Sequence, residues 1–336
     1  MSLEDAKRVK KKYELNLKKY PYVKGVGIGF KVVGGKKTDQ LAIITTVVKK
    51  QPLSLLSPKE IIPKSLEGIP TDVQEIGNPM ILPPRPSTVD RTSKIRPSPC
   101  GVSVGHYAIT AGTQGLIVKD ASKTYILSNN HVLANENRAA IGDPVLQPGP
   151  YDGGKNPDDI IAKLSRFVTL KGQISDCTFA GIWTQMYNIP NSYRGGKTRL
   201  YAFADADNEV DCAIAEVNLS DIDPTILEIG KPKGAKEPQL GILCKKSGRT
   251  TGLTKDGPVD LLDWSGDIGY SNGNLHFVGQ GVIISDNWSG GGDSGSSILD
   301  QEDDIAIGLL FAGSDQATIF NPINKVLEAL QVEVLV

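Results

Sequence analysis

Residues 289–296 read Ser-Gly-Gly-Gly-Asp-Ser-Gly-Ser, a glycine-rich stretch around Ser294. Glycines on both sides of a serine allow a tight backbone turn that exposes its Oγ. In such a turn the N–H groups of Gly292 and Ser294 can converge on one point, and two converging donors form an oxyanion hole. The competing interpretation is a glycine-rich turn without function, because Gly-Asp-Ser-Gly arises by chance on the order of a few times in a hundred chains of this composition.

A histidine at the end of an apolar run is the second candidate. His131 directly follows the strand-like residues 125–130. A strand end holds a general base rigidly beside a loop that a substrate can reach. The two other histidines, His106 and His276, lie inside strand-like runs, where a structural or surface role is the better interpretation.

An aspartate that enters an apolar strand is the third candidate. Asp211 precedes residues 212–217, most of which are apolar. A partly buried carboxylate needs a partner, and a histidine Nδ1–H would suit it, since this bond holds the imidazole in the tautomer that accepts a serine proton. The competing interpretation is a surface aspartate at the start of a strand.

In the order His131, Asp211, Ser294, these motifs resemble the trypsin-like (chymotrypsin-fold) serine proteases. The resemblance implies that His131 is the general base, Asp211 the orienting acid and Ser294 the nucleophile. It further implies that Gly292 and Ser294 supply the oxyanion-hole amides and that Asp293 anchors the nucleophile loop.

The same resemblance implies a set of substrate-binding residues. Phe311, Ala312 and Gly313 would pair with the substrate backbone, and Trp288 would lie at the base of the primary pocket, where trypsin-type members carry aspartate. A buried indole has no charge to compensate a substrate cation, which favours cleavage after small or medium apolar residues. A shift of two residues would bring Asp286 into the pocket instead.

Composition and patterning predict a mostly β protein with more than one domain. The chain of 336 residues contains 36 glycines and 21 prolines, which favours many short strands and tight turns. Residues 1–78 are predicted to form a small α/β N-terminal domain, with an amphipathic helix at 3–19, and residues 79–98 a proline-rich linker. The resemblance implies a chymotrypsin-like double β-barrel with a C-terminal helix over residues 99–336. No fold is predicted for an insertion around residues 173–207.

Two further motifs, residues 128–133 and 246–254, resemble an intracellular bacterial branch of the family that is related to the plant narrow-leaf protease. Secreted members carry a disulfide cysteine directly after the catalytic histidine, where this chain has Val132. The four cysteines are far apart and predict neither a disulfide framework nor a zinc site. Without a signal peptide or an apolar run of 18 residues, the chain is predicted to be cytoplasmic, with no membrane contact.

The predicted function is a serine endopeptidase that forms an acyl-enzyme and needs no metal or organic cofactor. The expected partner is a protein or peptide substrate; nucleic acid is not expected, because 37 Lys and Arg balance 38 Asp and Glu. Two alternatives stay open: a non-enzymatic binding scaffold on a protease fold, and an acyl hydrolase that acts on esters. Residues 1–78 contain no histidine, so assembly, with a homo-oligomer left open, or regulation is expected of them rather than catalysis.

Overall fold

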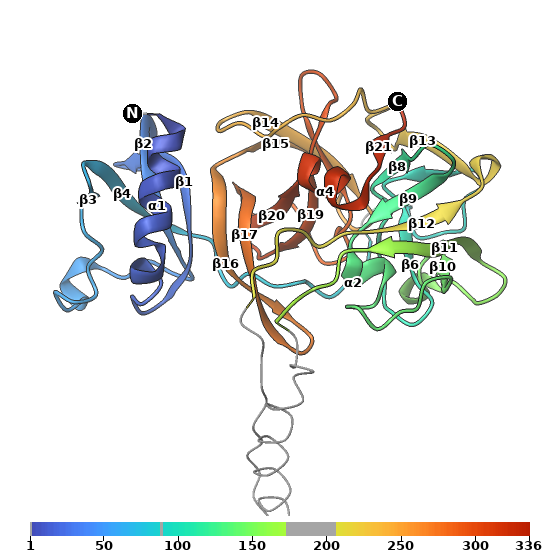
Figure 1. The fold of residues 1–336 in the computed structure, drawn as a ribbon, viewed down its shortest axis with the longest axis horizontal. Helices are drawn as coiled ribbons and strands as arrows, with labels where there is room; N and C mark the ends of the chain where they lie inside the picture. Colours follow the sequence, from blue (N-terminus) through green and yellow to red (C-terminus); the bar gives the residue numbers. More distant parts are fainter. Residues whose placement is uncertain (1, 88–89, 173–205) are drawn as a thin grey trace, which may run out of the picture.

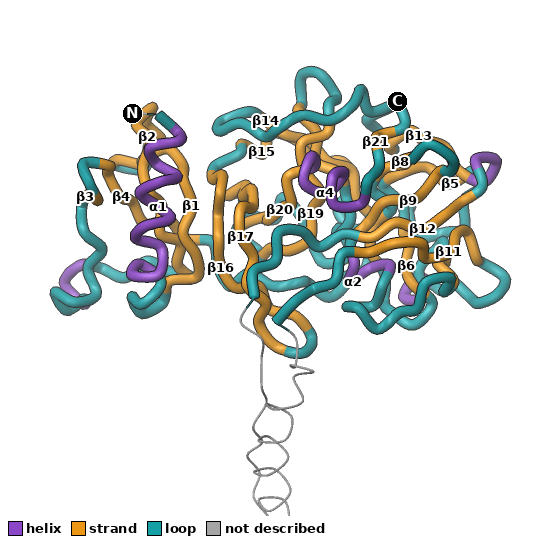
Figure 2. Tube along the Cα trace, viewed as in Figure 1, coloured by secondary structure: helices purple, strands orange, loops and turns teal. Residues whose placement is uncertain are grey.

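Strands are the predominant regular structure of the described chain, and most of them form two large sheets (Figure 1). The computed structural model describes residues 2–87, 90–172 and 206–336, so most of the insertion predicted around 173–207 lies outside the described residues. Figure 2 shows that strands dominate on both sides of the molecule and that helices are few.

The eight-stranded sheet holds the part of the chain around His131 and Asp211. Its strand order is β21 (Glu333–Val334), β8 (Leu116–Lys119), β9 (Thr124–Ser128), β12 (Ala213–Val217), β11 (Ile160–Phe167), β10 (Pro144–Leu146), β6 (Ser103–His106) and β7 (Gly112–Thr113). In the antiparallel pair β9–β12, Ala213 lies opposite Ser128. This register puts the end of β9 beside the start of β12, although the two segments are far apart in sequence.

The eleven-stranded sheet holds the nucleophile loop and continues into the N-terminal region. Its order is β15 (Gly252–Pro258), β14 (Leu243–Gly248), β18 (Ser297–Asp300), β19 (Ala306–Gly313), β20 (Ala317–Pro322), β17 (Gly273–Ile284), β16 (Leu261–Tyr270), β1 (Val23–Val33), β2 (Lys36–Val47), β4 (Ile69–Glu75) and β3 (Ser65–Leu66). A separate parallel pair joins β13 (Ile222–Ile226) to β5 (Ser98–Cys100). The sequence from 289 to 296 is the connection between β17 and β18.

The N-terminal unit is one helix packed on its own strands. Helix α1 (Leu3–Leu17) begins with a capping box between Ser2 and Asp5, and it buries Ala6, Val9 and Leu17 in the core that β1 and β2 share. The predicted helix near the start of the chain is therefore confirmed. In Figure 1 this unit is drawn in blue on the left of the molecule, next to β16.

Strand β1 joins the N-terminal unit to the rest of the protein by pairing antiparallel with β16. Gly25 lies opposite Gly266, and a Cβ on Gly25 would overlap the buried Trp264 ring. Glycine at this position thus allows β1 to pack closely against β16. As a result the strands of the N-terminal unit extend the C-terminal sheet.

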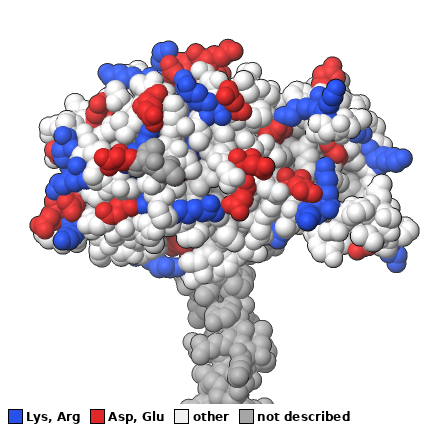
Figure 3. Space-filling model, turned by 180° about the vertical axis from the view of Figure 1, so that it is seen from behind, with Lys and Arg blue, Asp and Glu red and all other residues white. Residues whose placement is uncertain are grey.

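The remaining helices are short. They are α2 (Asn130–Leu133), α4 (Ile323–Leu330), and the single 3₁₀ turns η1 (Leu53–Leu55), η2 (Pro150–Asp152) and η3 (Leu219–Asp221). Helix α4 contributes Ile323, Val326 and Leu330 to the core beneath the eight-stranded sheet. No helix in the described ranges is long and apolar enough to cross a membrane. On the face drawn in Figure 3, basic and acidic side chains are interspersed, in keeping with the balanced net charge.

The predicted fold class is confirmed. The protein is mostly β, with a chymotrypsin-like arrangement of two β units and a small α/β unit in front of them. A core of apolar side chains fills the eight-stranded unit, and two further clusters fill the C-terminal one. The candidate residues lie where these two units meet.

Candidate active site

His131 and Asp211 form a direct hydrogen bond. His131 lies in the short helix α2, directly after β9, and Asp211 lies directly before β12. The imidazole Nδ1 is 2.5 Å from Asp211 Oδ2, and the backbone N–H of His131 donates to Oδ1 at 3.3 Å. The carboxylate is fully buried, so it holds both the ring and the backbone of the histidine in one orientation.

The Asp211 carboxylate accepts a third hydrogen bond, from a residue that sequence reasoning missed. The hydroxyl of Tyr270 donates to Asp211 Oδ2 at 2.5 Å, and the Tyr270 ring meets the His131 ring edge-on with centroids 6.1 Å apart. Burial, and then the charge of Asp211, raises the pKa of Tyr270 well above its usual value, so the phenol stays a donor. No sequence motif marks Tyr270, which reaches the site only through the end of β16.

Ser294 lies in the turn between β17 and β18 and contacts the eight-stranded unit. Its Oγ donates to the carbonyl of Phe311 at 3.4 Å, and its own carbonyl accepts from Thr113 N–H at 2.7 Å. Gly292 and Gly295 have φ values of +99° and +92°. A Cβ on Gly295 would also overlap Ser128 Oγ. Glycine is therefore required on both sides of the serine.

The backbone N–H groups of Gly292 and Ser294 are without a hydrogen-bond acceptor among the described residues. The carbonyl of Gly291 accepts from Arg85 N–H at 2.9 Å and from Thr250 Oγ1 at 2.7 Å. Since the peptide is planar and trans, the Gly292 N–H points the opposite way from that carbonyl. Buried N–H groups without partners are rare and are suited to an external acceptor.

His131 and Ser294 line one cavity of about 610 Å³, together with Tyr270 and Glu136. The structure thus brings the three candidate residues together, His131 and Asp211 by a hydrogen bond and His131 and Ser294 across a shared cavity. Among the described residues no hydrogen bond joins His131 to Ser294, whose hydroxyl is bonded to Phe311. His106 and His276 lie elsewhere, bonded to Asp143 and Asp267.

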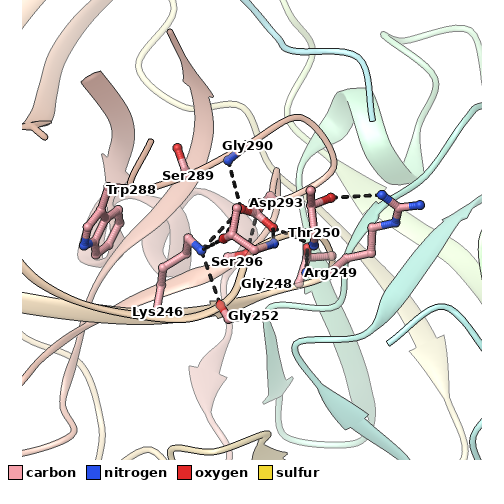
Figure 4. Close-up of polar contacts among 12 residues, drawn as sticks. Lys246, Gly248, Arg249, Thr250, Gly252, Trp288, Ser289, Gly290, Asp293 and Ser296 are labelled. Carbon is pink, nitrogen blue, oxygen red and sulfur yellow. Dashed lines mark hydrogen bonds and ion pairs between the residues drawn. The ribbon is translucent and has the colours of Figure 1, made fainter. Parts of the chain in front are cut away.

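Asp293 anchors the turn through its buried side chain (Figure 4). Its buried carboxylate accepts from the N–H groups of Thr250 and Gly290 at 2.8 and 2.9 Å, and from Thr251 Oγ1 at 2.7 Å. The ammonium of Lys246 lies 3.3 Å from Oδ2, and neither side chain is exposed. Burial acts to raise the pKa of Asp293, but the charge of Lys246 and these hydrogen bonds outweigh it and hold the pKa low.

Trp288 packs under Lys246 and is not among the residues that line the cavity. Its Nε1–H donates to the carbonyl of Lys255 at 3.0 Å, and the Lys246 ammonium lies 5.6 Å from the ring centroid. Of the other predicted substrate-binding residues, Phe311 and Ala312 are buried in β19, and Gly313 is its last residue. The structure therefore places Trp288 with the anchor of the turn, beside Lys246 (Figure 4).

No cysteine in the described ranges competes with Ser294 as a nucleophile. Cys100, Cys212 and Cys244 are free and buried, whereas Cys177 lies outside the described residues. Burial raises the pKa of both Cys100 and Cys244 to about 12. These thiols stay protonated at neutral pH and are poor nucleophiles.

Replacing Lys246 should destabilise the protein strongly. Lys246→Met removes the charge and leaves Asp293 buried without a cation. Breaking a buried pair from one side costs about 3–5 kcal/mol, so we expect the free energy of unfolding, measured in denaturant, to fall by that amount. Lys123→Met is the matched control, because its pair with Glu216 is about half exposed and should contribute little. An unfolding free energy equal to that of the wild type would contradict the anchoring role.

The destabilisation of the same variant should shrink in acid. In the wild type the lowered pKa of Asp293 contributes stability above the unfolded pKa of about 3.9, and this contribution is lost as the pH falls through the lower folded value. Without Lys246 the folded pKa of Asp293 rises, so the variant has less of this contribution to lose, and the unfolding free energies of the two proteins should approach each other as the pH falls. Unfolding followed against pH for both proteins measures the difference.

No protein-family model and no curated protein sequence matches the chain. Among solved structures the chain is similar to a glutamic-acid-specific serine protease (16% identity, TM-score 0.43, 70% of this chain and 100% of that one). It is also similar to protease A of Thermobifida fusca (15%, 0.43, 72% and 98%) and to Nocardiopsis protease (14%, 0.45, 70% and 98%).

Proposed function

We propose that the chain is a serine endopeptidase with Ser294 as nucleophile, His131 as general base and Asp211 as orienting acid. One observation carries the proposal: a fully buried Asp211 accepts from His131 Nδ1, and this histidine shares a cavity with Ser294. Such a carboxylate fixes the ring so that Nε2 is free to accept a proton. The unpaired N–H groups of Gly292 and Ser294 support the proposal independently.

The chemistry follows from these roles. Nε2 of His131 takes the proton of Ser294 Oγ as the oxygen attacks the carbonyl carbon of the substrate. The oxygen of the tetrahedral intermediate accepts from the N–H groups of Gly292 and Ser294. His131 then protonates the amine as the C–N bond breaks and an acyl-enzyme forms. A water molecule, deprotonated by His131, hydrolyses the ester and restores the serine.

We place the protein in the intracellular bacterial branch of the trypsin-like family, in the cytoplasm. The motifs at 128–133 and 246–254 support this, and so do the free, buried thiols of Cys100, Cys212 and Cys244. Residues 1–78 form an α/β domain in this proposal, 79–98 the linker and 99–336 the protease domain.

An alkyl fluorophosphonate tests the proposal, because it reacts with a serine only where base and oxyanion donors are in place. We expect stoichiometric labelling of Ser294, located by peptide mass mapping, together with hydrolysis of an unfolded protein such as casein. Absence of labelling in folded protein would favour the binding scaffold. Labelling with turnover of a p-nitrophenyl ester, but of no peptide, would favour the ester hydrolase.

A further inference from the structure

Residues 79–85, which we call the strap, pass between the ends of β19 and β16, and Met80 forms an isolated β-bridge to each of them. Met80 exchanges two backbone hydrogen bonds with Gly313, N–H to carbonyl at 3.0 Å in each direction. On the other side, Gly269 N–H donates to the carbonyl of the residue before Met80 at 3.1 Å, and its carbonyl accepts from the residue after Met80 at 3.0 Å. The strap therefore uses both hydrogen-bonding groups of Gly313.

Beyond Met80 the strap reaches the nucleophile loop. A Cβ on Gly291 would overlap the carbonyl oxygen of Pro83, and Arg85 N–H donates to the carbonyl of Gly291 at 2.9 Å. Gly291 is only three residues before Ser294. If the antiparallel register at Gly313 continued, Leu82 would lie opposite Phe311, whose carbonyl accepts from Ser294 Oγ.

The strap also faces the candidate catalytic residues. Residues 80–84 line the same cavity as His131 and Ser294. An extended peptide binds an edge strand by pairing with its free N–H and C=O groups. At Gly313 those groups are already bonded to the protein's own backbone. A peptide substrate and the strap thus need the same two hydrogen bonds.

We propose that the strap is an internal occupant of the substrate groove and that an extended peptide binds only after displacing it from Gly313. This inference rests on the proposed function, since it concerns the regulation of that same site. The strap is tethered close by: Ser314 Oγ donates to the carbonyl of Ile76 at 2.5 Å, and Arg249 donates to the carbonyl of Arg85. A tethered segment acts at a high effective concentration, so it competes well even with few bonds.

The amino-acid composition of the strap limits its pairing with β19 to a short stretch. Pro83 and Pro84 have no N–H to donate, so the pairing cannot continue past Leu82, the residue that this register would place opposite Phe311. Their fixed φ angles also reduce the entropy lost when the segment is ordered. The strap is therefore preorganised, and its contact with the edge of β19 consists of two hydrogen bonds.

Two probes separate occupancy of the groove from the chemistry. An alkyl fluorophosphonate needs only Ser294, His131 and the oxyanion donors. A tripeptidyl phosphonate ester with apolar residues also needs Gly313. Met80→Pro removes the N–H that bonds to Gly313. We expect it to accelerate labelling by the tripeptidyl probe on the order of tenfold relative to the alkyl probe, the factor expected when one competing hydrogen bond is lost.

The ratio of the two labelling rates is the readout, because a partly misfolded protein loses both reactions equally. Met80→Ala is the matched control: it keeps the backbone bonds and should leave the ratio unchanged. Replacing residues 81–84 with Gly-Ser-Gly-Ser is the second variant and should raise the ratio in the same way. An unchanged or lower ratio in both variants would overturn the inference. Failure of the alkyl probe in every protein, wild type included, would instead overturn the proposed function.

Discussion

Ser294→Ala should lower kcat for peptide hydrolysis by on the order of 10⁴–10⁶-fold while the protein stays folded. The substitution removes only the side-chain hydroxyl group. Among the described residues this group makes one long hydrogen bond, to the carbonyl of Phe311 at 3.4 Å. Its loss therefore changes little in the folded state. It abolishes acyl-enzyme formation, because no oxygen is left to attack the carbonyl carbon.

Ser297→Ala is the control for this experiment. Ser297 is also buried and lies three residues further on, but within the described part of the chain its Oγ has no hydrogen-bond partner. We expect full activity and full fluorophosphonate labelling from this variant. If Ser294→Ala kept the hydrolysis rate and the labelling of the wild type, Ser294 would not be the nucleophile.

Asp211→Asn should lower kcat/KM by on the order of 10⁴-fold. An amide in place of the carboxylate turns an acceptor into a donor at Nδ2, so the His131 ring moves its proton to Nε2 and can no longer accept one from Ser294. The negative charge that stabilises the protonated histidine is lost as well. Steady-state hydrolysis of a peptide substrate measures the effect.

Tyr270→Phe is the matched control for Asp211→Asn. It removes one donor from the same carboxylate but leaves the acid and its bond to His131. A hydrogen bond to a charged group contributes about 1.5–3 kcal/mol, so the loss in rate should stay within about 100-fold. An Asp211→Asn protein that remained within tenfold of the wild type would contradict the role of orienting acid.

Local patterns were enough to predict the elements that periodicity and turn residues define. The helix at the start of the chain, the strand that leads to His131 and the glycine requirement at the Ser294 turn all follow from short-range rules. The order of His131, Asp211 and Ser294 follows from motifs, and in the structure His131 shares a cavity with Ser294 and a hydrogen bond with Asp211.

Contacts between distant strands were not predictable in this way. Tyr270 belongs to no motif, and the motif at 246–254 does not indicate what Lys246 contacts. Tyr270 meets Asp211, and Lys246 meets Asp293, only after the sheets have formed. The position of Trp288 was inferred from an aligned position in other proteins, but the indole packs against Lys246 instead of lining the cavity. Composition predicts that the proline-rich segment is extended, but it contains no signal for pairing with Gly313.

The pairing of β1 with β16 has a consequence for the synthesis of the protein. Gly25 leaves the ribosome long before Gly266, its partner, so during that interval β1 has an unpaired edge of N–H and C=O groups. Closing so large a loop is slow, and an exposed strand edge in the meantime promotes aggregation. The nascent chain therefore passes through a state in which the N-terminal unit is complete on one side only, and a chaperone that covers this edge would raise the yield of folded protein.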